Sequence, residues 1–487
     1  MIPRTSLRLS PLAAVVIIAT ISASSLRAQP AFDRTRAPTL ARPARLVVPP
    51  VLTTSLPNGI RLKVVEQREL PLVQVIASID GGVRLDGNMP GMSTFMAGLL
   101  DDGAGTRDAA TLQSEIAFLG ANLSSTASWD GYSVSLKVAL RSLDPAMDLL
   151  ADVIRRPTFS SAEVRRQRDL RLAGYLQTRD RPEAVAGLAF SKAVFPDGHP
   201  YHRATNGDSA TTASLDSAKV RAFYQSVVRP ERLTFIVVGD ISLAQARAAI
   251  AARFGDWRAS GTGLVTPAIT VSPTVRRASQ VYLIDKPDAA QSVIQVGWPG
   301  VSRTSPDYAP LMVMNTILGG SFTSRLNMKL RETKGYSYGA GSGFVFRKVP
   351  GPFNASASVR TNVTDSSLVE FFAELRAIRE TPVSADELER ARNYLELQLP
   401  GDLEGTTQVA GQVAELQSFG LSLGELPRFA AAVRRVTAAE VQRVARRYLT
   451  PDRATIVVVG DLAKVRAGID ALKLGTTEVW DVKSVVR

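Results

Sequence analysis

An internal repeat limits the fold of this 487-residue chain more than any other feature. Residues 230–240 read PERLTFIVVGD and residues 451–461 read PDRATIVVVGD, so that seven of eleven positions are identical at an offset of 221 residues. Each copy follows an amphipathic helical pattern, at 217–227 or 438–448, and reads as a buried β-branched strand that ends at Gly-Asp. Because this offset is far too long for a solenoid, the repeat predicts two homologous α+β domains.

Composition places the boundaries around these two domains. Gly, Ser, Thr and Pro gather at 258–273, which predicts a linker between a first domain at 51–257 and a second domain at 274–487. Residues 29–50 are rich in Pro, Ala and Arg and predict a flexible leader.

Local patterns predict the main elements of the domains. Residues 60–65 and 72–79 alternate as strands, and capping boxes at 160–163 and 384–387 open long helices in matching places. Residues 90–103 predict a helix packed on a sheet, with Pro near its start and Gly at its end. Its apolar stripe consists of Met92, Phe95, Met96, Leu99 and Leu100.

The N-terminus has the pattern of a targeting segment. Arg4 and Arg8 precede a short apolar run at 11–21, and small residues lie before Gln29. The run is too short for a comfortable membrane span, although an uncleaved anchor stays an alternative. We therefore expect residues 1–28 to be a signal peptide and the protein to be exported, most simply to a bacterial periplasm.

Composition also excludes several kinds of site. The chain has no cysteine, which removes disulfides, thiolate metal sites and thiol nucleophiles. It has two histidines, His199 and His202, in a Pro-containing turn that we expect at the surface and that supplies two metal ligands at most. The net charge of +13 is spread as single arginines along helices, so we expect no nucleic-acid partner.

Several segments together resemble the M16 peptidase family, which includes insulinase, pitrilysin and the mitochondrial processing peptidase. The resemblance covers about residues 53–470. It implies two M16-type α+β domains, each an antiparallel-rich sheet covered by helices, which form half of a clamshell around a peptide chamber. It rests on the 90–103 helix, Gly105–Asp108, the turn Gly198–Tyr201, both Val-Val-Gly-Asp strands, and the second-half motif at 318–326 and 330–339.

The chain departs from the family at its metal site. Catalytic members carry His-x-x-Glu-His on the helix, where two histidines bind zinc and the glutamate activates water. The aligned positions here are Thr94, Ala97 and Gly98. The third ligand of the family, a glutamate, falls close to 172–174, where no carboxylate stands. The resemblance therefore implies no zinc and no other cofactor in this chain.

A second feature of the family is present. Catalytic members use an Arg and a Tyr seven residues apart, supplied by the domain opposite the zinc, and Arg331 and Tyr338 have this spacing. Strand alternation places Tyr336 and Tyr338 on one face, so spacing alone selects Tyr338. A phenol can donate to a developing oxyanion, and a guanidinium can bind peptide carbonyls or carboxylates.

These features suggest a division of labour between two subunits. We expect this chain to be the non-zinc subunit of an exported heterodimeric M16 peptidase, inactive alone. Its partners would be a peptide substrate and a zinc-bearing M16 homologue, with no stable membrane span in this chain. One alternative is an inactive peptide-binding or assembly protein that keeps the fold as a scaffold. Another is a basic surface-binding protein, but no clustered basic patch supports it.

Overall fold

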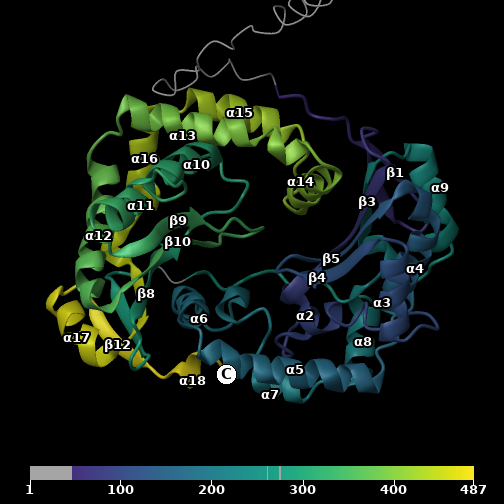
Figure 1. The fold of residues 1–487 in the computed structure, drawn as a ribbon, viewed down its shortest axis with the longest axis horizontal. Coiled ribbons are helices and arrows are strands. Elements are labelled where there is room, and N and C mark those ends of the chain that lie inside the picture. The colour runs from purple at the N-terminus through teal and green to yellow at the C-terminus, as the bar shows by residue number, and fades with distance from the viewer. Residues whose placement is uncertain (1–45, 260, 274–275) are drawn as a thin grey trace, which may run out of the picture. The chain divides into compact units, whose positions relative to one another are not determined.

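Two six-stranded sheets organise the part of the chain that the structure, a computed structural model, describes: residues 46–259, 261–273 and 276–487 (Figure 1). The expected signal peptide at 1–28 and most of the expected leader at 29–50 lie outside the described residues. Within the described ranges, no helix combines the length and the apolar character that crossing a membrane demands.

The first sheet has the strand order β1-β2-β6-β3-β5-β4. Only the β2–β6 pair is parallel, and the other neighbours are antiparallel. Its strands are β1 (Leu52–Ser55), β2 (Arg61–Glu66), β3 (Leu72–Asp80), β4 (Asn122–Ala127), β5 (Gly131–Ala139) and β6 (Leu233–Gly239).

The second sheet repeats this plan in the order β12-β7-β11-β8-β10-β9. β11 is parallel to β7 and antiparallel to β8, as β6 is to β2 and β3. The two repeated sequence segments thus form equivalent inner strands, and every residue of β6 and β11 is buried. The strands are β7 (Gln280–Asp285), β8 (Gln291–Pro299), β9 (Ser337–Phe344), β10 (Pro352–Arg360), β11 (Thr455–Gly460) and β12 (Thr476–Trp480).

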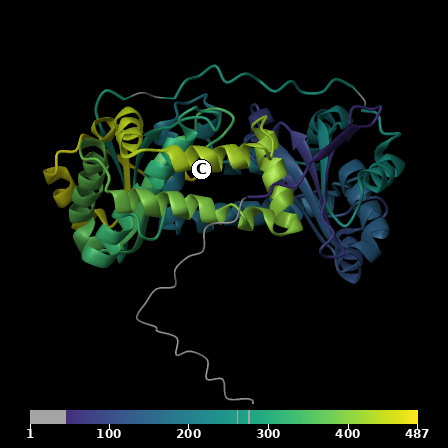
Figure 2. The same ribbon diagram turned by 90° about the horizontal axis from the view of Figure 1, so that it is seen from above.

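Helices cover both sheets. Those of the first half are α2 (Met92–Ala97), α3 (Ala109–Phe118), α4 (Leu143–Arg155), α5 (Ser161–Arg179), α6 (Pro182–Val194), α7 (Ser209–Ala213), α8 (Ser217–Val227) and α9 (Leu243–Phe254). Those of the second half are α10 (Tyr308–Leu318), α11 (Arg325–Asn327), α12 (Thr364–Glu380), α13 (Ala385–Gln398), α14 (Thr406–Ser418), α15 (Glu425–Arg435), α16 (Ala438–Tyr448), α17 (Leu462–Ala471) and α18 (Val482–Val485). Residues 261–273 hold neither helix nor strand (Figure 2).

The two halves exchange one helix each. α6 packs on β8 and β11 of the second sheet, whereas α14 packs on β3 and β6 of the first sheet (Figure 1). On the second sheet, Val185, Ala189 and Phe190 of α6 share an apolar cluster with Val293, Val457 and Val459. On the first sheet, Val409, Val413 and Leu416 of α14 share one with Val65, Ile236 and Val238. Inner strands buried on both faces need continuous apolar sequence, which explains the unbroken valine runs.

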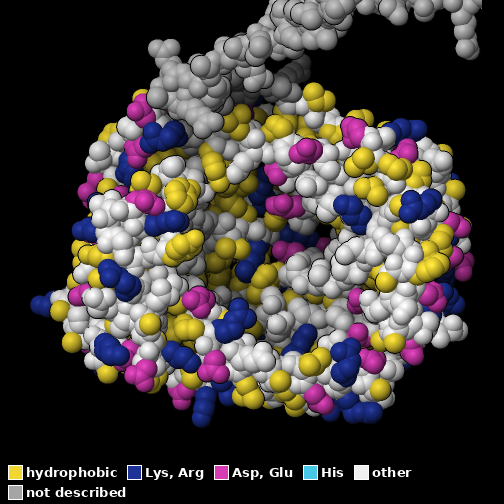
Figure 3. Space-filling model, viewed as in Figure 1, with side chains coloured by type: hydrophobic (Ala, Val, Ile, Leu, Met, Phe, Trp, Pro, Cys, Tyr) yellow, Lys and Arg dark blue, Asp and Glu magenta, His cyan; other side chains and the backbone are white. Residues whose placement is uncertain are grey.

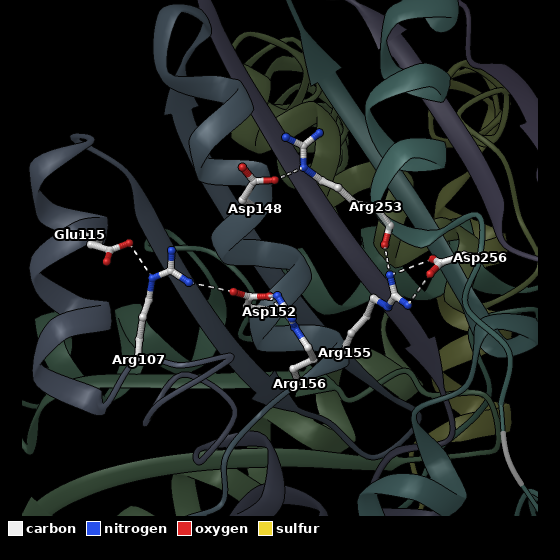
Figure 4. A network of polar contacts seen from close by, with 8 residues as sticks. All are labelled: Arg107, Glu115, Asp148, Asp152, Arg155, Arg156, Arg253 and Asp256. Carbon is white, nitrogen blue, oxygen red and sulfur yellow. Dashed lines mark hydrogen bonds and ion pairs between the residues drawn. The ribbon is translucent and has the colours of Figure 1, made fainter.

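The Gly105–Asp108 motif fastens the start of α3 to the end of α4. The carboxylate of Asp152, 6% exposed, accepts from Arg107 Nη1 at 2.8 Å and from Arg156 Nε at 2.9 Å (Figure 4). A Cβ on Gly105, whose φ is +62°, would lie 2.6 Å from Asp152 Oδ2, so only glycine allows this approach. Asp108 caps α3 by accepting from the Thr111 N–H. The motif is therefore structural.

The structure corrects the expected end of one helix and the expected capping of another. The helix expected at 90–103 is the shorter α2, which ends at Ala97, after which the chain continues in turns with i to i−3 hydrogen bonds. Gly98 favours this ending, and the Ala97 carbonyl accepts from Ser125 Oγ at 2.7 Å. The capping box at 160–163 is half-formed, since the Glu163 carboxylate accepts from Arg166 instead, whereas the box at 384–387 is complete.

Candidate functional site

The degenerate metal positions lie on α2 and carry no metal ligand. Thr94 Oγ1 donates to the carbonyls of Gly91 and Thr205, at 3.1 and 3.0 Å. Ala97 is buried and Gly98 ends the helix. The hydroxyl, methyl and hydrogen at these positions offer neither imidazole nor carboxylate to a metal ion.

A guanidinium fills the space beside them. Arg171, from α5, donates through Nη1 to the Gly91 carbonyl at 2.9 Å and to Thr94 Oγ1 at 3.1 Å. Its Cζ lies 5.0 Å from the centroid of the Phe95 ring. Burial lowers the pKa of Arg171. Arg171 is the last residue of a basic stretch at 164–171, and its guanidinium contacts the first of the degenerate ligand positions, Thr94.

A buried carboxylate supports the same corner. Asp86 accepts from the backbone N–H groups of Gly91 and Ser93, each at 2.8 Å, and so caps the start of α2. Burial raises the pKa of Asp86 to about 6, and the charge of Arg171 acts in the opposite direction. One carboxylate opposite a fixed cation does not make a zinc site. Nowhere in the described ranges do three His, Cys, Asp or Glu side chains gather closely enough to hold a metal ion. These residues do not fit zinc.

We expect the purified protein to contain far less than one zinc per chain. Arg171 places a positive charge where a divalent cation would have to bind, and the ligand positions supply no anionic or imidazole donor. Elemental analysis of the tag-free protein after exposure to zinc checks this. Stoichiometric zinc that survives dialysis would contradict the prediction. Treatment of the protein with a chelator should leave its melting temperature unchanged.

The histidine turn lies only partly at the surface, because His199 is buried and His202 is half-buried. His199 is 2% exposed, stacks on Phe195 at 4.6 Å and accepts through Nδ1 from the Tyr201 N–H at 3.1 Å. His202 Nδ1 lies 2.7 Å from the Phe195 carbonyl oxygen. Both rings thus organise the turn. Burial lowers the pKa of His199 to about 4.

This burial predicts acid sensitivity. Unfolded histidine titrates near 6.5, so between pH 6.5 and 4 the unfolded chain binds a proton that folded His199 does not. Stability should therefore fall as the pH falls through this range, by up to about 3 kcal/mol from this residue. The difference in unfolding free energy between wild type and His199→Asn, measured at several pH values, isolates the effect. The contributions of Asp86 and Asp101, whose pKa burial raises to about 6, cancel in this comparison. A difference that is constant from pH 4 to 7 would contradict the prediction.

The structure brings Arg331 and Tyr338 together at the edge strand of the second sheet. The Cζ of Arg331 lies 4.7 Å from the ring centroid of Tyr338 and 4.9 Å from that of Phe322. Arg331 Nε lies 3.1 Å from Glu332 Oε1. Tyr338 is 86% exposed and Phe322 is 60% exposed. The guanidinium thus lies against two aromatic rings, and Tyr338 is exposed to solvent.

The 318–326 motif positions this pair through close packing. Gly319 accepts from the Ser342 N–H of β9 at 3.0 Å, and a Cβ on Gly319 would lie 2.3 Å from that nitrogen. Asn327 donates to the Phe322 carbonyl at 2.6 Å and accepts from the Ala340 N–H at 3.2 Å. These contacts fasten the loop that carries Phe322 to the strand that carries Tyr338.

The arginine of the motif, Arg325, has a structural role. Its guanidinium donates to both carboxylate oxygens of Glu387, at 2.7 and 3.0 Å. These bonds lower the pKa of Glu387 to about 2. Glu387 also accepts from Ser384 in the capping box of α13. Arg325 therefore ties the loop before the site to the start of a long helix.

The structure distinguishes the two tyrosines that the sequence could not. Tyr336 packs against the second core, whereas Tyr338 is exposed. The expectation that both lie on one strand face was wrong, because β9 begins at Ser337 and its pairing with β10 shifts between Ala357 and Val359. Two other residues of these sites, Arg171 and Phe322, were missed. Their only sequence signal was their place within or beside family motifs.

Family models match most of the described chain. Residues 64–200 match the model described as "Insulinase (Peptidase family M16)", and residues 214–395 match "Peptidase M16 inactive domain". The chain belongs to the M16 family. As an M16 protein with a degenerate metal helix, it is a homologue of zinc proteases that lacks the family's ligands.

Named relatives agree with this assignment. A Mycobacterium leprae protein named as an uncharacterized zinc protease is 27% identical over 292 residues, which are 59% of this chain and 64% of that protein. A probable mitochondrial-processing peptidase subunit beta from Arabidopsis thaliana is 23% identical over 86% of this chain and 80% of its own length.

Solved structures show the same fold. The peptidase M16 inactive domain from Pseudomonas fluorescens superposes with a TM-score of 0.78 at 26% identity and covers 84% of this chain and 98% of its own. The first half of the periplasmic protease PqqL from Escherichia coli superposes with a TM-score of 0.69 at 16% identity, over 88% of this chain and 98% of its own.

Proposed function

We propose that this chain is the non-zinc subunit of an exported heterodimeric M16 peptidase and supplies Arg331 and Tyr338 to the active site of a zinc-bearing partner. One observation carries the proposal. The Arg331–Tyr338 pair is assembled and faces solvent, whereas Arg171 occupies the corner where the same chain would need zinc. A half-site exposed in this way is suited to completing the site of another protein.

The chemistry of the pair fits peptide hydrolysis. The Tyr338 phenol can donate to the carbonyl oxygen of the scissile bond as it becomes an oxyanion, which is where such donors act most strongly. The Arg331 guanidinium can donate two N–H groups to a substrate carbonyl or carboxylate. Contact with the rings of Phe322 and Tyr338 limits the motion of this guanidinium, so less conformational entropy is lost when substrate binds.

The relatives support a second subunit and export. The Arabidopsis relative is named as one subunit of a processing peptidase, which by its name works with another. The PqqL structure is the first half of a periplasmic protease whose whole chain is matched over 51% of its length, so in that protein a part of this fold is joined to a second part. In this proposal the metal belongs to the partner, this chain holds no cofactor, and residues 1–28 direct export.

A reconstitution experiment tests the proposal. The tagged mature chain, produced in its native host, should capture a homologue that carries His-x-x-Glu-His from the exported fraction. The purified mixture should cleave peptides in a chelator-sensitive manner, and neither protein alone should do so. If every zinc-motif homologue of the host fails to bind or to gain activity, the chain is the alternative, a scaffold that keeps the fold without the reaction.

A further inference from the structure

A cavity of about 830 Å³ lies apart from the Arg331–Tyr338 pair. Its walls are the open face of the first sheet, the end of α14, and residues 345–348 between β9 and β10. Figure 3 shows a hollow in the region that these elements surround in Figure 1, with basic and acidic side chains at its rim. The volume lies within the range of ligand-binding clefts.

The position of α14 explains why this face stays open and polar. Alternate residues of β2 point to it, and they read Arg61, Lys63 and Val65. α14 covers Val65 together with Ile236, so the apolar end of the face is buried. Arg61 and Lys63 line the cavity instead. One end of this sheet face is therefore apolar and covered by α14, and the other end presents two neighbouring cations to the cavity.

The cations of the cavity outnumber its free anions. Asp80 is ion-paired with Lys348 at 2.6 Å, and Asp130 with Arg84 at 3.1 Å. Four further cations lack a carboxylate within ion-pair distance among the residues that the structure describes, and one exposed acid, Glu415, stands against them. These cations are Arg61, Lys63, Arg232 and Arg347.

Two buried polar atoms in these walls lack partners. Within the described chain, neither Arg232 Nη1 nor Gln417 Oε1 has a hydrogen-bond partner, although both are shielded from solvent. One is a donor from the sheet side and the other an acceptor from α14. Buried polar atoms are rarely left unpaired, because each costs about 1–3 kcal/mol. Because both residues line the cavity, a small turn of their side chains would bring the two atoms to its surface, where a ligand with an anionic acceptor and an N–H donor would satisfy them.

A peptide that carries a carboxylate has both groups. We propose that this cavity binds an extended acidic peptide, with a carboxylate against Arg61, Lys63 and Arg232 and a backbone N–H toward Gln417 Oε1. The carboxylate comes from an Asp or Glu side chain or from the peptide C-terminus. The inference rests on the proposed function, because it assigns the class of peptide that the Arg331–Tyr338 half-site receives.

Binding to the mature chain alone tests this without the partner. Fluorescence anisotropy compares a labelled Glu-containing peptide with its Gln counterpart, each with a free and with an amidated C-terminus. At low salt the Glu peptide should bind about tenfold or more tightly, which is the effect of one charged hydrogen bond, and added salt should reduce the difference. Preference for the free terminus alone would identify the α-carboxylate as the source. Equal binding of all four peptides would overturn the proposal.

Matched variants locate the site. Lys63→Met should reduce acidic-peptide affinity about tenfold or more, and Arg247→Met, the same charge change on the exposed face of α9, should not. The pKa of Lys63 is lowered by burial and by Arg61, so its charge disfavours folding and Lys63→Met should keep the wild-type melting temperature. Equal losses in both variants would show a general electrostatic effect and overturn the site.

The two proposals can fail separately. If the chain shows no preference for the Glu peptide but the mixture with the zinc-bearing partner is active, this inference alone is refuted. If the chain prefers the Glu peptide but the mixture is inactive, the proposed function alone is refuted.

Discussion

Neither half of this chain should fold when it is produced alone. Without residues 276–487, the first sheet loses α14 and exposes Val65, Ile236 and Val238, and without residues 46–259 the second sheet loses α6. Burying one such side chain contributes about 1.5–3 kcal/mol. Each exchange buries at least six apolar side chains, three from the helix and three from the sheet. Their contribution is comparable with the whole stability of a typical domain, about 5–15 kcal/mol.

Circular dichroism and thermal unfolding of the separate halves check this result. We expect no cooperative unfolding transition in either half, whereas co-produced halves should elute together as a one-to-one complex, because no covalent bond is needed for the exchange. The intact chain nicked within 261–273, where there is neither helix nor strand, is the control and should stay folded. A cooperative transition in a half alone would show that the exchanged helix is dispensable.

The second large effect concerns turnover. In an active mixture with the zinc-bearing partner, Tyr338→Phe should lower turnover by about 10²–10³-fold, the usual cost of losing one oxyanion donor, roughly 2.7–4 kcal/mol. Tyr338 is 86% exposed and its ring still stacks on Arg331 after the change, so stability and peptide binding should stay close to wild type. Steady-state kinetics with the purified pair of proteins measure the effect.

Two variants frame this result. Tyr336→Phe is the control, since Tyr336 packs on the second core instead of facing solvent, and its turnover should change little. Arg331→Ala should weaken substrate binding as well as turnover, because it removes a charged anchor and the support for the Tyr338 ring. Turnover within twofold of wild type for Tyr338→Phe would assign this chain to the scaffold alternative.

Local patterns predicted the elements of the fold better than their ends. The alternating residues 60–65 and 72–79 form β2 and β3 within one residue at each end. The stripe at 90–103 reported burial correctly, since its five apolar residues are all buried, but it predicted too long a helix. Burial repeats in the same way in a helix and in tight turns that follow it, so the pattern alone does not show where α2 ends.

The sequence by itself determined the duplication and the missing metal ligands. The identity between residues 230–240 and 451–461 can be read directly from the sequence, and Thr94, Ala97 and Gly98 offer no imidazole or carboxylate to a metal ion in any conformation. Tertiary structure alone decided that α6 and α14 each pack on the sheet of the other half. It also decided which groups Arg171 contacts and which of the two tyrosines is exposed. The physical reason is that periodicity shows that a side chain is buried, but the partner that buries it comes from residues far away in the chain. The helix exchange and the open basic face beside α14 depend on such distant contacts.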